Sequence, residues 1–244
     1  MVTGASGNLG KVIVNHLLGS KYHVIAQVRT LEKAQSLQIQ NNNHLSIVVL
    51  DFDDDDFISS LLNQLSNLQI YPDALINNAR TVKSLSCDED GMCSTESLNS
   101  EFKFAVIIPY LLTKTLANIH NTKLKQVINI GSQYGSVASN LGLYDGDLSQ
   151  APLQYGVAKA AQNHLTKELA VRLIRKGIRV NSLSLGGIEG RVDDDFKSRY
   201  SKLCPMGRML REDEFLGAID FFLSDNCFPC IGQNLVVDGG WTLW

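Results

Sequence analysis

Short apolar runs alternate with amphipathic stretches along this chain, and that alternation constrains its fold more than any other feature. The apolar runs predict buried strands at residues 24–26, 47–50, 74–76, 127–130 and 235–237. The stretches between them predict helices at residues 11–18, 31–37, 57–65, 97–119 and 154–176. Strands that alternate with helices build a parallel sheet with helices on both faces. We therefore expect an α/β fold.

Length and charge narrow the class of protein further. The chain has 244 residues, of which 44% are hydrophobic, enough for one α/β domain over residues 1–244 with a large core. The formal net charge of −3 argues against a nucleic-acid partner, since such proteins carry basic patches. Neither a bilayer-spanning apolar run, which needs about 20 residues, nor a basic-then-apolar leader is seen. We expect a cytoplasmic protein that binds neither nucleic acid nor membrane.

The cysteines and histidines do not predict a metal site. Five cysteines are present, an odd count that suits a reducing compartment rather than a disulfide framework. Cys227 and Cys230 have thioredoxin-like spacing, but no second pair of ligands lies near them in the sequence. The five histidines show no ligand spacing either. A metal or redox role for this pair stays the minor alternative.

A glycine-rich turn stands where the first helix begins. It contains Gly4, Gly7 and Gly10 at three-residue intervals, with Ser6 and Leu9 between them. Glycines let the backbone approach a pyrophosphate, and the helix N-terminus supplies free N–H groups and a partial positive charge. The alternative is a tight structural corner without a ligand. The position of the turn in an alternating α/β chain favours dinucleotide binding.

The residues at the end of the predicted strand 24–26 indicate which dinucleotide binds. NAD-binding folds place Asp or Glu about 20 residues after the glycine turn, where it holds the ribose 2′-hydroxyl. Residues 26–30 contain no acid here, and Arg29 offers a planar cation that suits a 2′-phosphate, with Lys33 one turn later. We predict NADP, with NAD as the alternative cofactor if Arg29 is only a solvated strand end. In the acidic run 51–56, residues 53–56 are predicted to be N-cap and first-turn charges.

A tyrosine and a lysine one helical turn apart form the main catalytic signal. Tyr155 and Lys159 are four residues apart and share one helix face. A nearby cation favours the phenolate form of a tyrosine, which can then take part in proton transfer. Ser132 follows Gly131 at the end of an apolar strand. The alternatives are a strand-end cap for Ser132, a core aromatic for Tyr155 and a solvated helix face for Lys159.

These motifs together resemble one family. The shared elements are the glycine turn, Asp51-Phe52, Asn77-Asn78-Ala79, Gly131-Ser132, Tyr155-x-x-x-Lys159, Asn181…Gly186-Gly187 and Gly232-Gln233…Asp238-Gly239-Gly240. In this order and spacing the chain resembles the short-chain dehydrogenase/reductases over essentially its whole length. The resemblance implies a single doubly wound Rossmann-type domain that forms a homodimer or homotetramer, usually through helices 97–119 and 154–176.

The resemblance also implies roles for the candidate residues. Hydride would pass between a nicotinamide ring and an alcohol or carbonyl carbon of a small molecule. Ser132 would hydrogen-bond the substrate oxygen, Tyr155 would give or take the proton, and Lys159 would favour the phenolate and bind the nicotinamide ribose. The further cofactor contacts implied are Asp51 and Phe52 at the adenine, Asn78 and Ala79 along the cleft, and Gly186 to Ile188 at the nicotinamide half.

Several features depart from the family pattern. The first strand is almost missing, because only Met1 and Val2 precede Thr3 and the glycine turn. The sheet is therefore predicted to be truncated or unusually built. Arg80 replaces a glycine, Ala105 stands at the position of a helix asparagine that supports a proton relay, and Leu185 replaces a proline. These changes keep open a second hypothesis, a non-catalytic member that senses a cofactor or binds a partner.

Substrate choice is expected in a variable lid at about residues 188–210. Its charged residues suggest a polar, phosphorylated or sugar-like substrate, although they also suit solvated helix faces: Glu189, Arg191, Arg199, Lys202 and Arg208. The segment around Tyr134 and Tyr144 and the C-terminal residues 238–244 loosely resemble members from bacterial surface-sugar and flagellin-glycan pathways. The glycine spacing resembles the extended branch, so an epimerase or dehydratase is a third hypothesis, which the short chain opposes.

Overall fold

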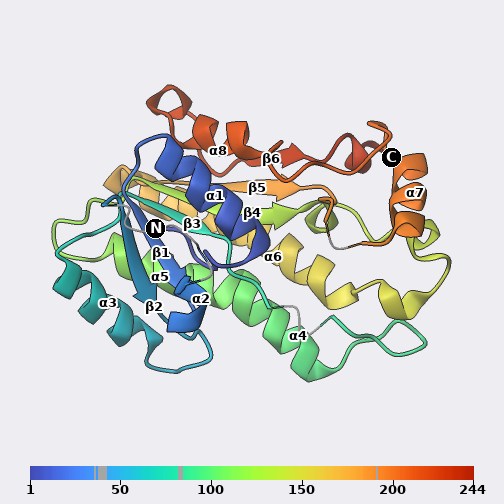
Figure 1. Cartoon of the computed structure of the whole chain (residues 1–244), viewed down its shortest axis with the longest axis horizontal. Helices are drawn as coiled ribbons and strands as arrows, with labels where there is room; N and C mark the ends of the chain where they lie inside the picture. Colours follow the sequence, from blue (N-terminus) through green and yellow to red (C-terminus); the bar gives the residue numbers. More distant parts are fainter. Residues whose placement is uncertain (36, 38–42, 82–84, 191) are drawn as a thin grey trace.

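A parallel sheet runs through the molecule, and its strand order follows a doubly wound pattern (Figure 1). The computed structural model describes residues 1–35, 37, 43–81, 85–190 and 192–244. The strands are β1 (Val24–Val28), β2 (Leu45–Val49), β3 (Ala74–Asn77), β4 (Gln126–Ser132), β5 (Arg179–Leu185) and β6 (Asn234–Val237). All paired strands are parallel, in the orders β2-β1 and β3-β4-β5-β6.

Val2 joins the two groups of strands at the centre of the sheet. It bridges Ala26 of β1 on one side and Ile76 of β3 on the other. The Val2 amide donates to the Ile25 carbonyl (2.9 Å), and the Val2 carbonyl accepts from the Gln27 amide (2.9 Å). Val2 therefore lies between β1 and β3, and its backbone bonds, next to the glycine turn, help to position that turn.

Helices cover both faces of this sheet. They are α1 (Asn8–Gly19), α2 (Leu31–Gln35), α3 (Phe57–Leu68), α4 (Thr95–Phe102), α5 (Ile108–Ala117), α6 (Leu153–Leu173), α7 (Asp194–Leu203) and α8 (Leu216–Leu223). One hydrophobic cluster packs α1 and α8 against one face, and another packs α3, α5 and α6 against the other (Figure 1). The doubly wound α/β prediction is confirmed.

The long helix predicted at residues 97–119 is interrupted in the structure. It consists of α4, a π-helical segment over Lys103–Ile107, and α5. A π-helical turn inserts an extra residue into the ladder of i→i−4 bonds and often marks a functional site. Hydrophobic periodicity does not distinguish a π segment from α-helix, so the sequence could not reveal it. Similarly, α6 ends at Leu173 and a 3₁₀ turn continues to Lys176, within the predicted span.

The predicted placement of residues 53–56 before a helix is confirmed and all four are exposed, but the capping hydrogen bond is absent. Asp56 stands at the N-cap of α3, yet its side chain makes no capping hydrogen bond. The carboxylates of Asp51 and Asp54 instead accept from the amides of Asp53 and Asp56, each at 3.0 Å. Short acidic side chains favour such local turns two residues ahead, which compete with capping. The run therefore shapes the loop between β2 and α3.

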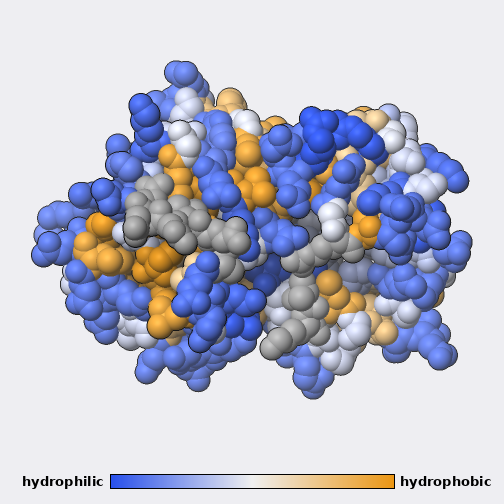
Figure 2. All heavy atoms as spheres, viewed as in Figure 1, coloured by the Kyte–Doolittle hydropathy of each residue, from blue (hydrophilic) through white to orange (hydrophobic). Residues whose placement is uncertain are grey.

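The surface carries its hydrophobic residues in separate patches. Hydrophilic residues cover most of the face seen in Figure 2, with hydrophobic groups between them. Among the described residues, no helix has both the length and the apolar character that crossing a bilayer requires.

Candidate active site

The glycine turn has a shape that a side chain would destroy. Gly4 has a φ of 63°, and a Cβ there would lie 2.8 Å from the Ala79 Cα. A Cβ on Gly10 would lie 2.1 Å from the Gly4 carbonyl oxygen. Helix α1 begins directly after its N-cap residue, Gly7, which has no side chain to cap the first amides of the helix. The partial positive charge of the α1 N-terminus and the close backbone packing of the turn suit a pyrophosphate.

Two amide side chains hold this turn in place. Gln27 is 2% exposed; its Oε1 accepts from the Gly4 amide and its Nε2 donates to the Leu50 carbonyl, both at 2.8 Å. Asn78 donates from Nδ2 to the Thr3 carbonyl at 2.9 Å. Asn78 was predicted to line the cofactor cleft, and it also fixes the turn. Gln27 was missed, although a lone amide inside an apolar strand signals a buried polar contact.

A cleft of about 700 Å³ opens at the carboxyl ends of the strands and collects nearly all the predicted residues. In open α/β sheets ligands bind at these strand ends. The predicted residues that line it are Gly4, Ser6, Gly7, Leu9, Gly10, Arg29, Phe52, Asn78, Ala79, Ser132, Tyr155, Lys159, Gly186 and Ile188. Asp51 is not in this lining. Its carboxylate lies 3.7 Å from the Arg29 Nε, so it faces the arginine predicted to choose the cofactor.

The three candidate catalytic residues meet in this cleft. The Lys159 Nζ lies 5.9 Å from the centre of the Tyr155 ring. Lys159 is only 8% exposed, which rules out a solvated helix face. Its ammonium donates to the Ile130 carbonyl (2.7 Å) and to Gln162 Oε1 (3.0 Å). Because an ammonium has three donors, one remains for a ligand hydroxyl. Ser132 ends β4 in the same lining, and its Oγ accepts from the Tyr134 amide.

Burial perturbs the charge of Lys159. Desolvation, followed by the repulsion of the Arg80 guanidinium, lowers the pKa of Lys159 to about 7, and the Glu101 carboxyl opposes this shift. A group that titrates near neutral pH can change charge during a reaction cycle. The pKa of Lys159 therefore depends on two charged residues, Arg80 and Glu101, in addition to its burial.

This pKa predicts how Lys159 affects stability. Between pH 7 and 10.5 the unfolded chain holds a proton on Lys159 that the folded chain releases, so its contribution to stability rises with pH by up to about 1.4 kcal/mol per pH unit. We expect the melting temperature of the wild type to rise relative to that of Lys159→Met from pH 7 to 9.5. Differential scanning calorimetry of both proteins measures this difference. Parallel pH curves would contradict the assignment.

Glu101 and Ala105 occupy the helix that faces the catalytic lysine. Ala105 lies in the π-helical segment and is buried, without any polar group to offer. Glu101, one turn earlier in α4, is 1% exposed, and its Oε1 has no hydrogen-bond partner among the described residues. Burial raises the pKa of the Glu101 carboxyl, while Arg80 and Lys159 oppose that rise. The sequence analysis missed Glu101, because a single acid in a surface-type helix carries no signal of burial.

Part of the predicted lid packs onto the loop from Gly186 to Ile188, which is predicted to contact the nicotinamide half of the cofactor. Ile188 bridges Leu210, the Leu210 amide donates to the Gly187 carbonyl (2.9 Å), and the Glu189 amide donates to the Leu210 carbonyl (2.9 Å). Tyr200 of α7 accepts from the Gly187 amide (2.9 Å) and stacks on Trp241 with ring centres 4.4 Å apart. The loop is therefore held from two sides.

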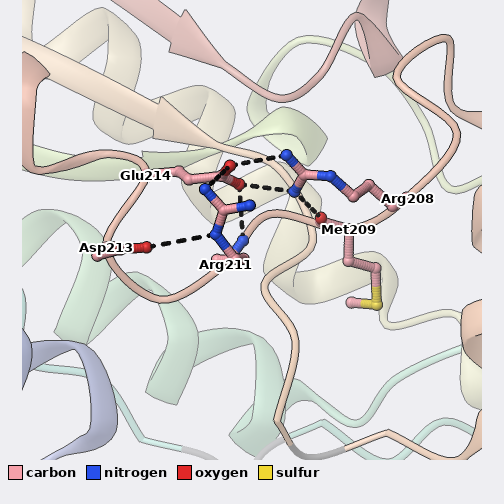
Figure 3. Close-up of polar contacts among 5 residues, drawn as sticks. All are labelled: Arg208, Met209, Arg211, Asp213 and Glu214. Carbon is pink, nitrogen blue, oxygen red and sulfur yellow. Dashed lines mark hydrogen bonds and ion pairs between the residues drawn. The ribbon is translucent and has the colours of Figure 1, made fainter.

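An ion-pair cluster fixes the lid segment that follows (Figure 3). Arg208 donates two hydrogen bonds of 2.7 Å to the Glu214 carboxylate, and Arg211 donates to the same group from its side chain and its amide, each at 2.8 Å. The hydrogen bond from Arg208, together with the Arg211 amide bond, lowers the pKa of Glu214 to about 2. The carboxylate thus remains charged at any ordinary pH.

This cluster limits which of the charged lid residues can meet a substrate. Arg208 is neutralised by Glu214, and the Arg199 Nε donates to the Leu143 carbonyl at 2.8 Å. Arg191 lies outside the described residues. Among the described lid residues, Ile188 and Glu189 line the cleft, and Glu212 lines it just beyond the lid. Side-chain pairing across a loop is not visible in the sequence, so the pairing of Arg208 and Arg199 with groups of the protein could not be predicted.

The arrangement defines a class of protein. A helix N-terminus behind a close-packed glycine turn can hold a dinucleotide phosphate, and a Cβ at Gly10 would fill that cradle. At the other end of the cleft, a half-buried tyrosine and a buried lysine stand beside a strand-end serine. The site combines dinucleotide binding with proton transfer, as in a nicotinamide-dependent oxidoreductase on a doubly wound sheet.

Comparison with known proteins agrees with this class. A family model described as enoyl-(acyl carrier protein) reductase matches residues 4–242. The chain is 28% identical to the post-translational flagellin modification protein A of Campylobacter coli, over 99% of this chain and 97% of that one. It is 26% identical to the NADH-dependent L-xylulose reductase of Ambrosiozyma monospora, over 100% of this chain and 94% of that one. These relatives are matched along their whole length.

A solved structure shows the same fold. The short-chain dehydrogenase of Leptospira borgpetersenii serovar Hardjo-bovis, with bound NAD⁺, superposes with a TM-score of 0.85 at 28% identity, covering 99% of this chain and 91% of that one. This chain belongs to the short-chain dehydrogenase/reductase family and is an NAD(P)-dependent enzyme of that family. Its resemblance to a flagellin-modification member, predicted from the sequence, is confirmed.

Proposed function

We propose that the chain transfers a hydride between NADP and a polar, sugar-like carbonyl or hydroxyl compound. The observation that carries this proposal is the convergence of Ser132, Tyr155 and Lys159 in one cleft with the glycine turn. The bound nicotinamide supplies or accepts the hydride. The protein's own residues must therefore orient the substrate oxygen and move one proton.

Each residue has a distinct part in that proton transfer. The Ser132 hydroxyl donates to the substrate oxygen and holds it beside Tyr155. The Tyr155 hydroxyl gives its proton during reduction and takes one during oxidation. The Lys159 ammonium, with its remaining N–H, binds a ribose hydroxyl and favours the phenolate that forms. The buried hydrogen bonds to the Ile130 carbonyl and to Gln162 hold the Lys159 Nζ in position while this happens.

Arg29 supports NADP as the cofactor. Its side chain lines the cleft, is 40% exposed and offers a guanidinium to a 2′-phosphate, although Asp51 partly offsets its charge. We expect Arg29→Ala to weaken NADPH binding about tenfold, since a bond to a charged group contributes roughly 1.5–3 kcal/mol and this one is solvent-screened. NADH binding is expected to change little.

Removing the acid beside Arg29, rather than Arg29 itself, is the control for this prediction. Asp51→Asn removes the carboxylate 3.7 Å from Arg29 and is expected to strengthen NADPH binding. Fluorescence titration of both variants with NADPH and NADH gives the ratio of affinities. If Arg29→Ala weakens NADPH and NADH equally, the cofactor choice lies elsewhere and NAD becomes the better proposal.

Polar side chains that line the cleft favour a hydrophilic substrate. Glu189, Glu212, Gln133 and Tyr134 line the cleft around the catalytic residues. Two relatives bear names of enzymes that act on sugars or polyols, an L-xylulose reductase and a D-arabinitol 2-dehydrogenase. We propose a sugar-like or hydroxylated compound on these grounds.

A carbonyl panel with deuterated cofactor tests the proposed function. NADPH carrying deuterium at C4 is incubated with ketoses, oxo acids and their neutral esters, and products are analysed by mass spectrometry. Transfer of one deuterium to a product carbon is the expected result. If the folded protein binds NADPH but transfers deuterium to none of these compounds, the non-catalytic hypothesis replaces this one.

We also propose that the chain forms a homo-oligomer. Ile107, Tyr110, Val157 and Val171 are exposed apolar residues on the helical run 95–117 and on α6. Exposed apolar groups gathered on neighbouring helices favour association. Sedimentation velocity, in which a dimer or tetramer is expected, tests this.

A further inference from the structure

Arg80 is a cation on the wall of the cleft with no anionic partner. Its guanidinium carbon lies 4.2 Å from the centre of the Tyr155 ring, and the residue is exposed and lines the cleft. Among the described residues no carboxylate lies within ion-pair distance of it. By contrast, Arg29 faces Asp51, and both Arg208 and Arg211 bond Glu214.

The neighbouring charges leave the Arg80 guanidinium available. Lys159 already donates to Ile130 and Gln162, and its one remaining N–H is the group that the proposed function assigns to a ribose hydroxyl. Glu101 feels the Arg80 charge from a fully buried position in α4, but it makes no ion pair with it. Glu189 and Glu212 line the same cleft without reaching Arg80. The open N–H groups of Arg80 are therefore exposed to whatever occupies the substrate end of the cleft.

Stacking on Tyr155 fixes where such an occupant would be held. A guanidinium that lies over an aromatic face keeps its N–H edge free for hydrogen bonds in its own plane. The Tyr155 hydroxyl must meet the substrate oxygen, so a group bound at Arg80 lies only a few bonds from the reacting carbon. A carboxylate matches the planar fork of a guanidinium with two parallel bonds.

We propose that Arg80 is a specificity residue that binds a carboxylate of the substrate, close to the carbonyl or hydroxyl that reacts. The substrate class is thereby narrowed to oxo acids, hydroxy acids and acidic sugars. This inference rests on the proposed function for its catalytic consequence, but the anion site itself can be measured without turnover.

Binding of a dicarboxylate probe tests the anion site directly. Malonate, and malonamide as its neutral match, are titrated into the NADP⁺-saturated protein by isothermal calorimetry. Wild type is expected to bind malonate and not malonamide, and Arg80→Gln to lose at least tenfold in malonate affinity, with partial recovery in Arg80→Lys. Equal malonate binding by wild type and Arg80→Gln, or none by wild type, overturns the proposal.

Turnover then separates this proposal from the proposed function. The kcat/KM for oxo acids is compared with that for their methyl esters, and wild type is expected to prefer the acids at least tenfold, a preference that Arg80→Gln loses. Turnover without acid preference overturns the Arg80 inference and keeps the oxidoreductase. Arg80-dependent malonate binding with no turnover of either series overturns the proposed function and supports the anion site. Circular dichroism of Arg80→Gln confirms that this exposed substitution leaves the fold intact.

Discussion

Replacing Tyr155 by phenylalanine is expected to lower kcat about 10³-fold with any substrate that the protein reduces. General acid–base catalysis contributes roughly 10²–10⁴ to a rate, and phenylalanine keeps the ring while removing the proton donor. The Arg80 guanidinium and the Lys159 ammonium lie over the ring rather than on the hydroxyl, so both contacts survive. NADPH affinity, measured by fluorescence, is expected to change less than threefold.

Tyr134 offers a matched control for this substitution. Its ring meets the Tyr155 ring edge to face at 6.4 Å, and its hydroxyl lies 3.0 Å from that of Tyr144. Burial raises the pKa of Tyr134, so its phenol keeps its proton and is a poor acid. Tyr134→Phe is expected to lower kcat far less than Tyr155→Phe. Equal losses in the two variants would show that the site needs aromatic packing rather than the Tyr155 proton.

Replacing Gly10 by alanine is expected to abolish cofactor binding, with an affinity loss of 100-fold or more. The added Cβ would lie 2.1 Å from the Gly4 carbonyl and 2.8 Å from the Ala5 Cα, and both contacts are to backbone that cannot rotate away. The backbone must shift to make room for the Cβ, which costs about 1–3 kcal/mol of stability. The same shift moves the glycine turn away from the helix N-terminus. NADPH titration and urea unfolding measure the two effects.

Gly19 in the same helix is the control for Gly10. A Cβ on Gly19 meets nothing within 4 Å, so Gly19→Ala should leave NADPH binding unchanged. Alanine is also the better helix former, so stability should stay level or rise slightly. If Gly10→Ala still binds NADPH like Gly19→Ala, the turn does not cradle the cofactor and the dinucleotide assignment fails.

Most of the sheet and the site could be predicted because local chemistry dictates both. Hydrophobic periodicity identifies buried strands such as β4, in which Val127, Ile128 and Ile130 are apolar and buried. The glycine turn, Ser132, Tyr155 and Lys159 depend on residue type and spacing, and the structure brings them into one cleft. Whether each residue acts as proposed remains a prediction.

Strand β5 escaped prediction because its side chains look polar. Arg179, Asn181, Ser182 and Ser184 alternate along a strand whose every residue is buried. Arg179 donates to the carbonyls of Phe222, Ser224 and Cys227, and distant carbonyls of this kind offset the cost of burying polar groups. Since these partners lie more than 40 residues away, no local pattern reveals them.

The charges around the site were the least predictable feature. Arg208 is neutralised by Glu214, Glu101 is buried beside Lys159, and Arg80 stands over the Tyr155 ring. Each of these depends on which segments meet across the cleft. The sequence predicted charged residues on the lid, but it could not show that Arg208 is paired, that Glu189 lines the cleft, or that Arg80 lies over the Tyr155 ring.

Fluorescence titration of the folded chain with NADPH and, separately, NADH tests the central claim most directly. The site predicts saturable binding at micromolar concentrations, tighter for NADPH than for NADH, and displacement of the reduced cofactor by NADP⁺. Binding of neither cofactor by a protein that circular dichroism shows to be folded would contradict the claim that this cleft is the working site of a nicotinamide-dependent oxidoreductase.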